Sequence, residues 1–224
     1  MAVIRCVMFD FGNVVGLFRT NEWYTFLRNH RGNCFEPHET FGSLLGVIQQ
    51  YDLGRLSALE FYQTFQDAYQ LRGVTKGEFF NALGSVLRID WEMVEIRDWL
   101  KRRGVVTVLV TNMSPFHAWY IRRNYPSLMA KFDHAMVSCE EGVAKPDFEA
   151  WIRPLEWAGL GAEEVIFLDD DYPNVKEACR LGIKGWHYNV TDQHYCQNGK
   201  LDQERARFKD FLNCLDSIGL LARN

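Results

Sequence analysis

The chain has 224 residues, of which 47% are hydrophobic, and its formal net charge is −4 with a pI near 5.9. This length suits one domain with a sizeable core, or one domain that carries a large insertion. The acidic balance argues against a dedicated nucleic-acid-binding protein, which would carry a basic face. The N-terminus has no basic stretch before an apolar run, and no charge-free stretch of about 18 apolar residues occurs. We therefore expect neither a signal peptide nor a membrane span.

The six cysteines are widely spaced, and none of them forms a CxxC pair. This spacing does not indicate a disulfide framework or a zinc site. It favours reduced thiols in a cytoplasmic protein, which we expect to be a monomer or a homodimer. The six are Cys6, Cys34, Cys139, Cys179, Cys196 and Cys214.

The first expected element is a buried strand over residues 3–9, and the segment after it has a different pattern from the rest of the chain. Over residues 17–88 no convincing strand occurs, and apolar residues recur at helical spacing. Ser57, three residues before Glu60, is typical of a capping box at a helix start. We therefore expect a helical cap domain over residues 17–88, inserted into a core of residues 1–16 and 89–224.

The remainder of the chain alternates short apolar runs with amphipathic segments. This order predicts an α/β fold with a Rossmann-like parallel sheet and helices on both faces. The expected strands cover residues 105–110, 134–137, 165–168 and 185–188, and the expected helices cover residues 91–103, 116–124, 148–158, 174–181 and 202–220.

Polar residues follow four of the five expected strands. Asp10 follows the first strand, Thr111 and Asn112 follow the second, Lys145 lies beyond the third, and Asp169, Asp170 and Asp171 follow the fourth. Ligands of open parallel sheets bind beyond the carboxyl ends of the strands, so we expect these side chains to converge. Converging carboxylates repel one another, and a hard cation such as Mg²⁺ relieves the repulsion. A nucleophile, a metal and donors for phosphoryl oxygens are what phosphoryl transfer requires.

These segments resemble the four motifs of the haloacid dehalogenase-like (HAD) hydrolase superfamily. The segments VMFDFGNVV, VLVTN, EEGVAKPD and VIFLDDDYPNVKEA match the motifs in order. The resemblance implies that Asp10 is a nucleophile that forms an aspartyl-phosphate. It implies that Thr111 and Asn112 hold the transferring phosphoryl group, and that Lys145 neutralises charge on the nucleophile and the phosphate.

The resemblance also implies a Mg²⁺ site and shows one departure at Gly12. The metal site would comprise Asp10, the backbone carbonyl of Gly12, Asp169 and Asp170, with Asp170 the more direct ligand of the last two. Most phosphatases of the superfamily have an aspartate at the position of Gly12, which acts as general acid and then as general base. Asn13 stands where glycine is usual, and asparagine tolerates a positive φ better than most residues.

The predicted function is Mg²⁺-dependent hydrolysis of a small phosphorylated metabolite. A sugar phosphate is one expected substrate, because sugar-phosphate phosphatases of the superfamily have a similar Asp-x-Gly-Asn-Val motif. One alternative is an impaired, phosphate-binding or scaffolding protein, and Gly12 is its main support. The other is a haloacid dehalogenase, since a halide leaves without protonation; the acidic pair Asp169 and Asp170 counts against it, because dehalogenases of the superfamily do not use the metal.

The missing general acid predicts a preference for phosphates with good leaving groups, because general acid catalysis typically contributes about 10²–10⁴ in rate. His117 could substitute for the acid, although a surface or capping role is the plainer interpretation. Arg19 could bind a second anionic group of a substrate, and a solvated arginine explains it equally well.

Overall fold

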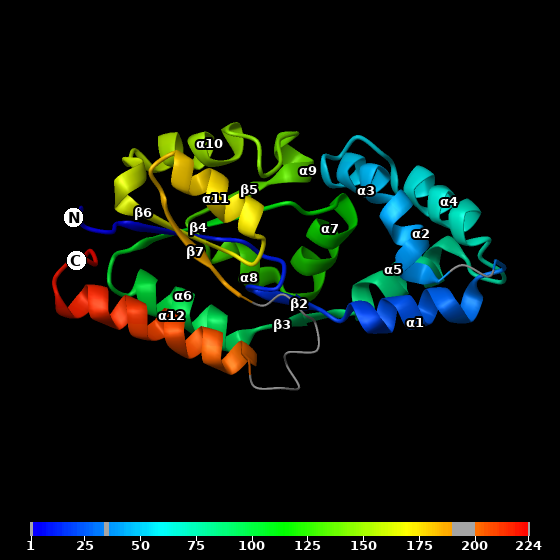
Figure 1. The fold of residues 1–224 in the computed structure, drawn as a ribbon, viewed down its shortest axis with the longest axis horizontal. Coiled ribbons are helices and arrows are strands. Elements are labelled where there is room, and N and C mark those ends of the chain that lie inside the picture. The colour runs from blue at the N-terminus through cyan, green and yellow to red at the C-terminus, as the bar shows by residue number, and fades with distance from the viewer. Residues whose placement is uncertain (1, 34–35, 190–199, 224) are drawn as a thin grey trace.

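The computed structural model describes residues 2–33, 36–189 and 200–223. A layered α/β core occupies one end of the molecule and a lobe of helices the other (Figure 1). The core contains a five-stranded sheet of order β5-β4-β1-β6-β7, in which every neighbouring pair is parallel. The strands are β1 (Cys6–Phe9), β4 (Val106–Thr111), β5 (His134–Val137), β6 (Val165–Asp169) and β7 (Lys184–His187).

The central strands are apolar along their length because helices cover both faces of the sheet. Every residue of β1 and β6 is buried. One face packs against helices that include α10 and α11, and the other packs against helices that include α6 and α12 (Figure 1). The core helices are α6 (Trp91–Lys101), α7 (Pro115–Asn124), α8 (Pro126–Ala130), α9 (Ser138–Glu141), α10 (Glu149–Ala158), α11 (Tyr172–Arg180) and α12 (Lys200–Ser217), with a 3₁₀ turn at Ala162–Glu164.

The helical lobe consists of five helices between β1 and the rest of the core. Their apolar faces meet in a cluster of buried side chains centred on Trp23, Phe61, Phe65 and Phe79. We propose that this cluster is the core of a cap domain over residues 17–88. The helices are α1 (Thr20–His30), α2 (Pro37–Ser43), α3 (Leu45–Asp52), α4 (Ala58–Tyr69) and α5 (Lys76–Ser85).

The predicted α/β fold is confirmed, and one expectation about the inserted segment is wrong. The capping box of Ser57 and Glu60 is present at the start of α4. However, β2 (Gly16–Phe18) and β3 (Leu87–Ile89) form a two-stranded antiparallel sheet where the lobe joins the core. Strands of three residues are too short to produce a readable alternation of apolar and polar residues. They pair because the chain entering the lobe and the chain leaving it lie side by side.

Within the described residues, no helix combines the length and apolar character needed to cross a bilayer. Four described cysteines, Cys6, Cys139, Cys179 and Cys214, are free thiols. Cys34 and Cys196 lie outside the described residues. Burial raises the pKa of Cys6 to about 12, so this thiol stays protonated and packs as a small apolar side chain.

Candidate active site

The carboxyl ends of the two central strands place two of the predicted aspartates beside each other. Phe9 of β1 pairs with Leu168 of β6, so the next residues, Asp10 and Asp169, leave the sheet at the same level. The Asp10 backbone N–H donates to the carbonyl of Leu168 at 2.8 Å, which fixes the start of the loop after β1. Both aspartates are buried.

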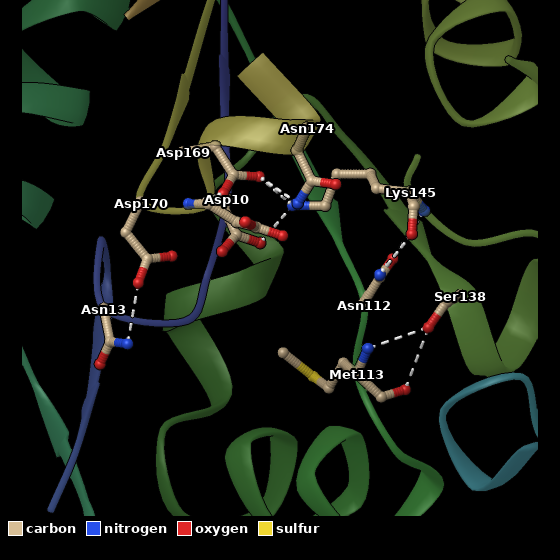
Figure 2. A network of polar contacts seen from close by, with 10 residues as sticks. Asp10, Asn13, Asn112, Met113, Ser138, Lys145, Asp169, Asp170 and Asn174 are labelled. Carbon is tan, nitrogen blue, oxygen red and sulfur yellow. Dashed lines mark hydrogen bonds and ion pairs between the residues drawn. The ribbon is translucent and has the colours of Figure 1, made fainter. Parts of the chain in front are cut away.

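Lys145 joins these two carboxylates from the loop beyond β5. Its Nζ donates to Asp10 Oδ1 at 2.7 Å and to Asp169 Oδ2 at 2.5 Å (Figure 2). The lysine side chain is only 1% exposed. A buried ammonium between two buried carboxylates is held by both charge and hydrogen bonds, and removing the lysine would leave two buried carboxylates without a counter-charge.

Neighbouring polar groups hold Asp169 and Asp170 in place. Asp169 Oδ1 accepts from the backbone N–H of Asp171 at 2.7 Å, and its Oδ2 accepts from Asn174 Nδ2 at 3.1 Å. Asp170 Oδ2 accepts from Asn13 Nδ2 at 2.9 Å (Figure 2). Asn13 has a φ of 51°, so the positive φ that its residue type allowed is confirmed. The loop after β1 therefore contacts the loop after β6 directly.

The side chains of Asp10, Asp169 and Asp170 suit a divalent cation. One carboxylate oxygen from each lies within 4.8 Å of the others. An all-oxygen donor set with several negative charges is what Mg²⁺ prefers in proteins. The Gly12 carbonyl is not used by the backbone bridge between Gly12 and Gly16, whose hydrogen bonds run from Asn13 N to Gly16 O and from Gly16 N to Phe11 O. Its metal contact stays a prediction.

Burial makes two of these carboxyls hold protons more tightly than usual. Burial raises the pKa of Asp10 to about 6, although Lys145 opposes the rise. Burial, together with the charge of Asp10, raises the pKa of Asp170 to about 7. Burial also acts to lower the pKa of Lys145, but its ion pairs with Asp10 and Asp169 outweigh this and raise it. The lysine is therefore cationic at neutral pH.

These shifts predict how Mg²⁺ changes thermal stability with pH. A carboxyl whose pKa is higher in the folded protein than in the unfolded chain lowers the free energy of unfolding as pH rises. For Asp10 and Asp170 this loss begins near pH 4 and continues through their folded pKa values of about 6 and 7. Protons also compete with a cation for the same oxygens. We expect Mg²⁺ at about 100 times its Kd to raise the Tm by about 5–10 °C at pH 8, and much less at pH 5.

Differential scanning fluorimetry with Mg²⁺ or EDTA at the two pH values measures this difference. Asp170→Asn should reduce the Mg²⁺-dependent shift at pH 8. An equal shift at both pH values would contradict the assignment of the cation to these carboxylates.

The structure places Thr111 and Asn112 at the same edge but gives Asn112 a further contact. Thr111 ends β4 and is 1% exposed. Asn112 Nδ2 donates to the backbone carbonyl of Lys145 at 2.8 Å, and Asn112 Oδ1 accepts from the Lys145 backbone N–H at 2.8 Å. The asparagine side chain therefore positions the lysine loop. Contact of either residue with a phosphoryl group stays a prediction.

His117 and Arg19, the two residues left open by the sequence, lie in different environments. His117 Nδ1 is 3.0 Å from Ser114 Oγ, and its buried Nε2 has no hydrogen-bond partner among the described residues. Burial lowers the pKa of His117 to about 4, with a small opposing effect from the backbone of Leu83. A ring that is neutral at pH 7 is a poor proton donor, which weakens the idea of a substitute acid. Arg19 is exposed and pairs with Glu22 at 2.8 Å.

A cavity of about 310 Å³ begins at this edge of the sheet and extends under the helical lobe. Its lobe side could not be predicted from the sequence, because helical spacing shows that a side chain is apolar and does not show what its helix packs against. The sheet side is formed by Phe11, Gly12, Asn13, Thr111, Asn112, Met113, Ser114 and His117; the lobe side by Phe18, Thr20, Trp23, Phe41, Ile48, Tyr51, Asp52, Phe61, Phe65, Leu83 and Val86.

Comparison with known proteins gives the family. The family model "haloacid dehalogenase-like hydrolase" matches residues 4–182. The chain belongs to this family of hydrolases.

The matches to individual relatives cover different shares of this chain and of the other protein. The sesquiterpene phosphatase astK of Aspergillus oryzae is 29% identical over 144 residues, which are 64% of this chain and 72% of that protein. The GMP/IMP nucleotidase YrfG of Escherichia coli is 27% identical over 134 residues, which are 60% of this chain and 59% of that protein. A HAD-family enzyme of Bacteroides thetaiotaomicron, solved with magnesium and inorganic phosphate, superposes with a TM-score of 0.69 at 25% identity, covering 82% of this chain and 93% of that one.

Proposed function

We propose that this protein is a Mg²⁺-dependent phosphomonoester hydrolase in which Asp10 is the nucleophile. The observation that carries the proposal is the buried cluster of Asp10, Lys145 and Asp169, with Asp170 completing a three-carboxylate set. Relatives named as a phosphatase and a nucleotidase, and a family member solved with magnesium and phosphate, support the same chemistry.

The proposed reaction has two steps. An Asp10 carboxylate oxygen attacks phosphorus, the bond from phosphorus to the ester oxygen breaks, and the alkoxide leaves. Water then attacks the phosphorus of the aspartyl-phosphate and releases inorganic phosphate and the free Asp10 carboxylate. Lys145 keeps Asp10 ionised and attracts the anionic phosphate, and a bound Mg²⁺ would supply positive charge to the phosphoryl oxygens.

Gly12 has no group that can protonate the leaving oxygen. In the proposed reaction, water supplies this proton, so reactivity should depend steeply on the leaving group. We propose that the substrate is a small phosphorylated metabolite. A sugar phosphate, which the first motif suggests, is one of the compounds to test.

A phosphate-release screen with Mg²⁺ and with EDTA tests this function. We expect release that requires Mg²⁺ and is faster for aryl and anomeric sugar phosphates than for simple alkyl phosphates. Halide release from a 2-haloacid in EDTA would instead support the dehalogenase. No release from any phosphate, together with tight phosphate binding, would support a binding or scaffolding role.

A further inference from the structure

The cavity beside Gly12 has a strongly uneven distribution of polar groups. On the lobe side its walls are mainly aromatic and aliphatic, with Trp23, Phe61 and Phe65 buried and Phe41 and Ile48 half-buried. Most of the polar side chains lie on the sheet side, next to the aspartate cluster, and the lobe side contributes Thr20, Tyr51 and Asp52.

Several of these sheet-side polar groups already have partners. Asn112 is bonded through both amide atoms to the Lys145 backbone, Asn13 donates to Asp170, and Ser114 Oγ contacts His117. Sugar hydroxyls that reached the lobe side of the cavity would therefore exchange water for mainly apolar walls, which is unfavourable where no new hydrogen bond forms.

Asp52 is the acidic residue among the described residues that line the cavity. It ends α3, where its backbone carbonyl accepts from Ser138 Oγ at 2.5 Å, and Ser138 Oγ also accepts from Met113 N at 2.9 Å. This chain of contacts fixes the end of α3 against the loop after β4. Burial raises the pKa of Asp52 to about 7, so near neutral pH a large share of this carboxyl is protonated and costs less to desolvate beside an apolar group.

The position of the cavity connects it to the nucleophile. A Cβ added at Gly12 would lie 3.6 Å from Asp10 Oδ2 and 3.8 Å from Phe18 Cε2. Gly12 is thus the point where the carboxylate of Asp10 and the aromatic wall meet. An alcohol attached to a phosphoryl group at Asp10 has this direction open to it.

We propose that the cavity binds the alcohol part of the substrate and that this alcohol is predominantly apolar, on the order of ten non-hydrogen atoms. The size follows from the volume of about 310 Å³, roughly twice that of a cavity that holds benzene. The inference rests on the proposed phosphatase function and selects an aryl or branched aliphatic phosphate over a sugar phosphate.

A series of para-alkylphenyl phosphates tests the proposal, because the alkyl chain changes apolar size while the leaving group stays a phenol of nearly constant acidity. From phenyl to para-ethyl, para-butyl and para-hexyl, we expect kcat/KM to rise by up to about fourfold per methylene until the cavity is full. Glucose 1-phosphate, a sugar with a good leaving group, should be a poorer substrate than para-butylphenyl phosphate. A flat or falling series, or a preference for glucose 1-phosphate, would overturn the inference.

Two variants of α3 locate the effect. Ile48→Asn places an amide in the cavity wall and should lower kcat/KM for the para-hexyl compound on the order of tenfold, with little change for phenyl phosphate. Leu45→Asn changes the same helix at a side chain that is 53% exposed and outside the cavity, and it should keep the wild-type series. Equal effects of the two variants would count against the proposal.

Binding of the corresponding phosphonates, measured by calorimetry, separates this inference from the function itself. Phosphonates cannot be hydrolysed, so their affinity reports binding without the reaction, and its change along the series reports the cavity. Affinity that rises with chain length while no phosphate ester is cleaved would overturn the phosphatase and keep the apolar site. Affinity independent of chain length would overturn the apolar site even in an active phosphatase.

Discussion

Replacing Asp10 by asparagine should lower kcat by at least about 10⁴-fold, in the range seen when a catalytic nucleophile is removed. Asparagine has nearly the same shape, but its amide is a poor nucleophile towards phosphorus. The buried ammonium of Lys145 keeps Asp169 as its anionic partner, so the fold should persist. Phosphate release gives the rate. Rapid acid quenching should trap a phosphoenzyme in the wild-type protein that hydroxylamine cleaves, as expected of an acyl phosphate, and no such species in Asp10→Asn.

Asp171→Asn is the matched control. Asp171 lies at the same sheet edge, but its exposed side chain is outside the three-carboxylate cluster. It should retain activity close to wild type. If Asp10→Asn kept activity within tenfold of the wild-type protein, another nucleophile or direct attack by water would have to replace the aspartyl-phosphate mechanism.

Gly12→Asp should raise kcat/KM for simple alkyl phosphates by about 10²–10⁴-fold, because it adds a carboxyl that can protonate the leaving oxygen. The backbone there is outside the left-handed region, and an added Cβ makes only ordinary contacts with Asp10 and Phe18. The gain should be small for aryl phosphates, whose leaving groups need less protonation. A plot of log kcat/KM against leaving-group pKa should become less steep in the variant.

Gly12→Asn separates acid catalysis from a change of shape. Its side chain is the same size as aspartate, yet it is a poor proton donor, so it should show no gain on alkyl phosphates. Equal losses in both variants would mean that a side chain at this position obstructs the substrate. An unchanged slope in Gly12→Asp would mean that another group already protonates the leaving oxygen.

Much of the core was predictable because its signals are local. The strand β1 is a continuous apolar run, β4, β5 and β6 are mainly apolar, and β6 begins at the predicted residue. In a parallel sheet all such runs end at one edge, so the residues that follow them were expected to converge. The contact of Lys145 with Asp10 and Asp169 agrees with that expectation.

Other features depended on partners distant in the sequence. The strands β2 and β3 are three residues each and pair across about 70 residues of intervening lobe. Asn112 holds the Lys145 backbone through a loop that no spacing rule connects to it. The pKa of His117 is low because residues of the lobe and the core bury it together.

The α/β class, the order of the four motifs and the absence of an acid at Gly12 could be read from the amino-acid sequence, since each depends on residue type and short-range pattern. What the helical lobe faces depends instead on tertiary packing. Trp23, Phe41 and Ile48 read as ordinary helix-packing residues along the chain, and only the packing of the lobe against the sheet edge makes them walls of a cavity beside Asp10. The burial of apolar surface has no directional preference. The spacing of apolar residues along a helix therefore indicates that one face is covered, but not whether a neighbouring helix or a substrate covers it.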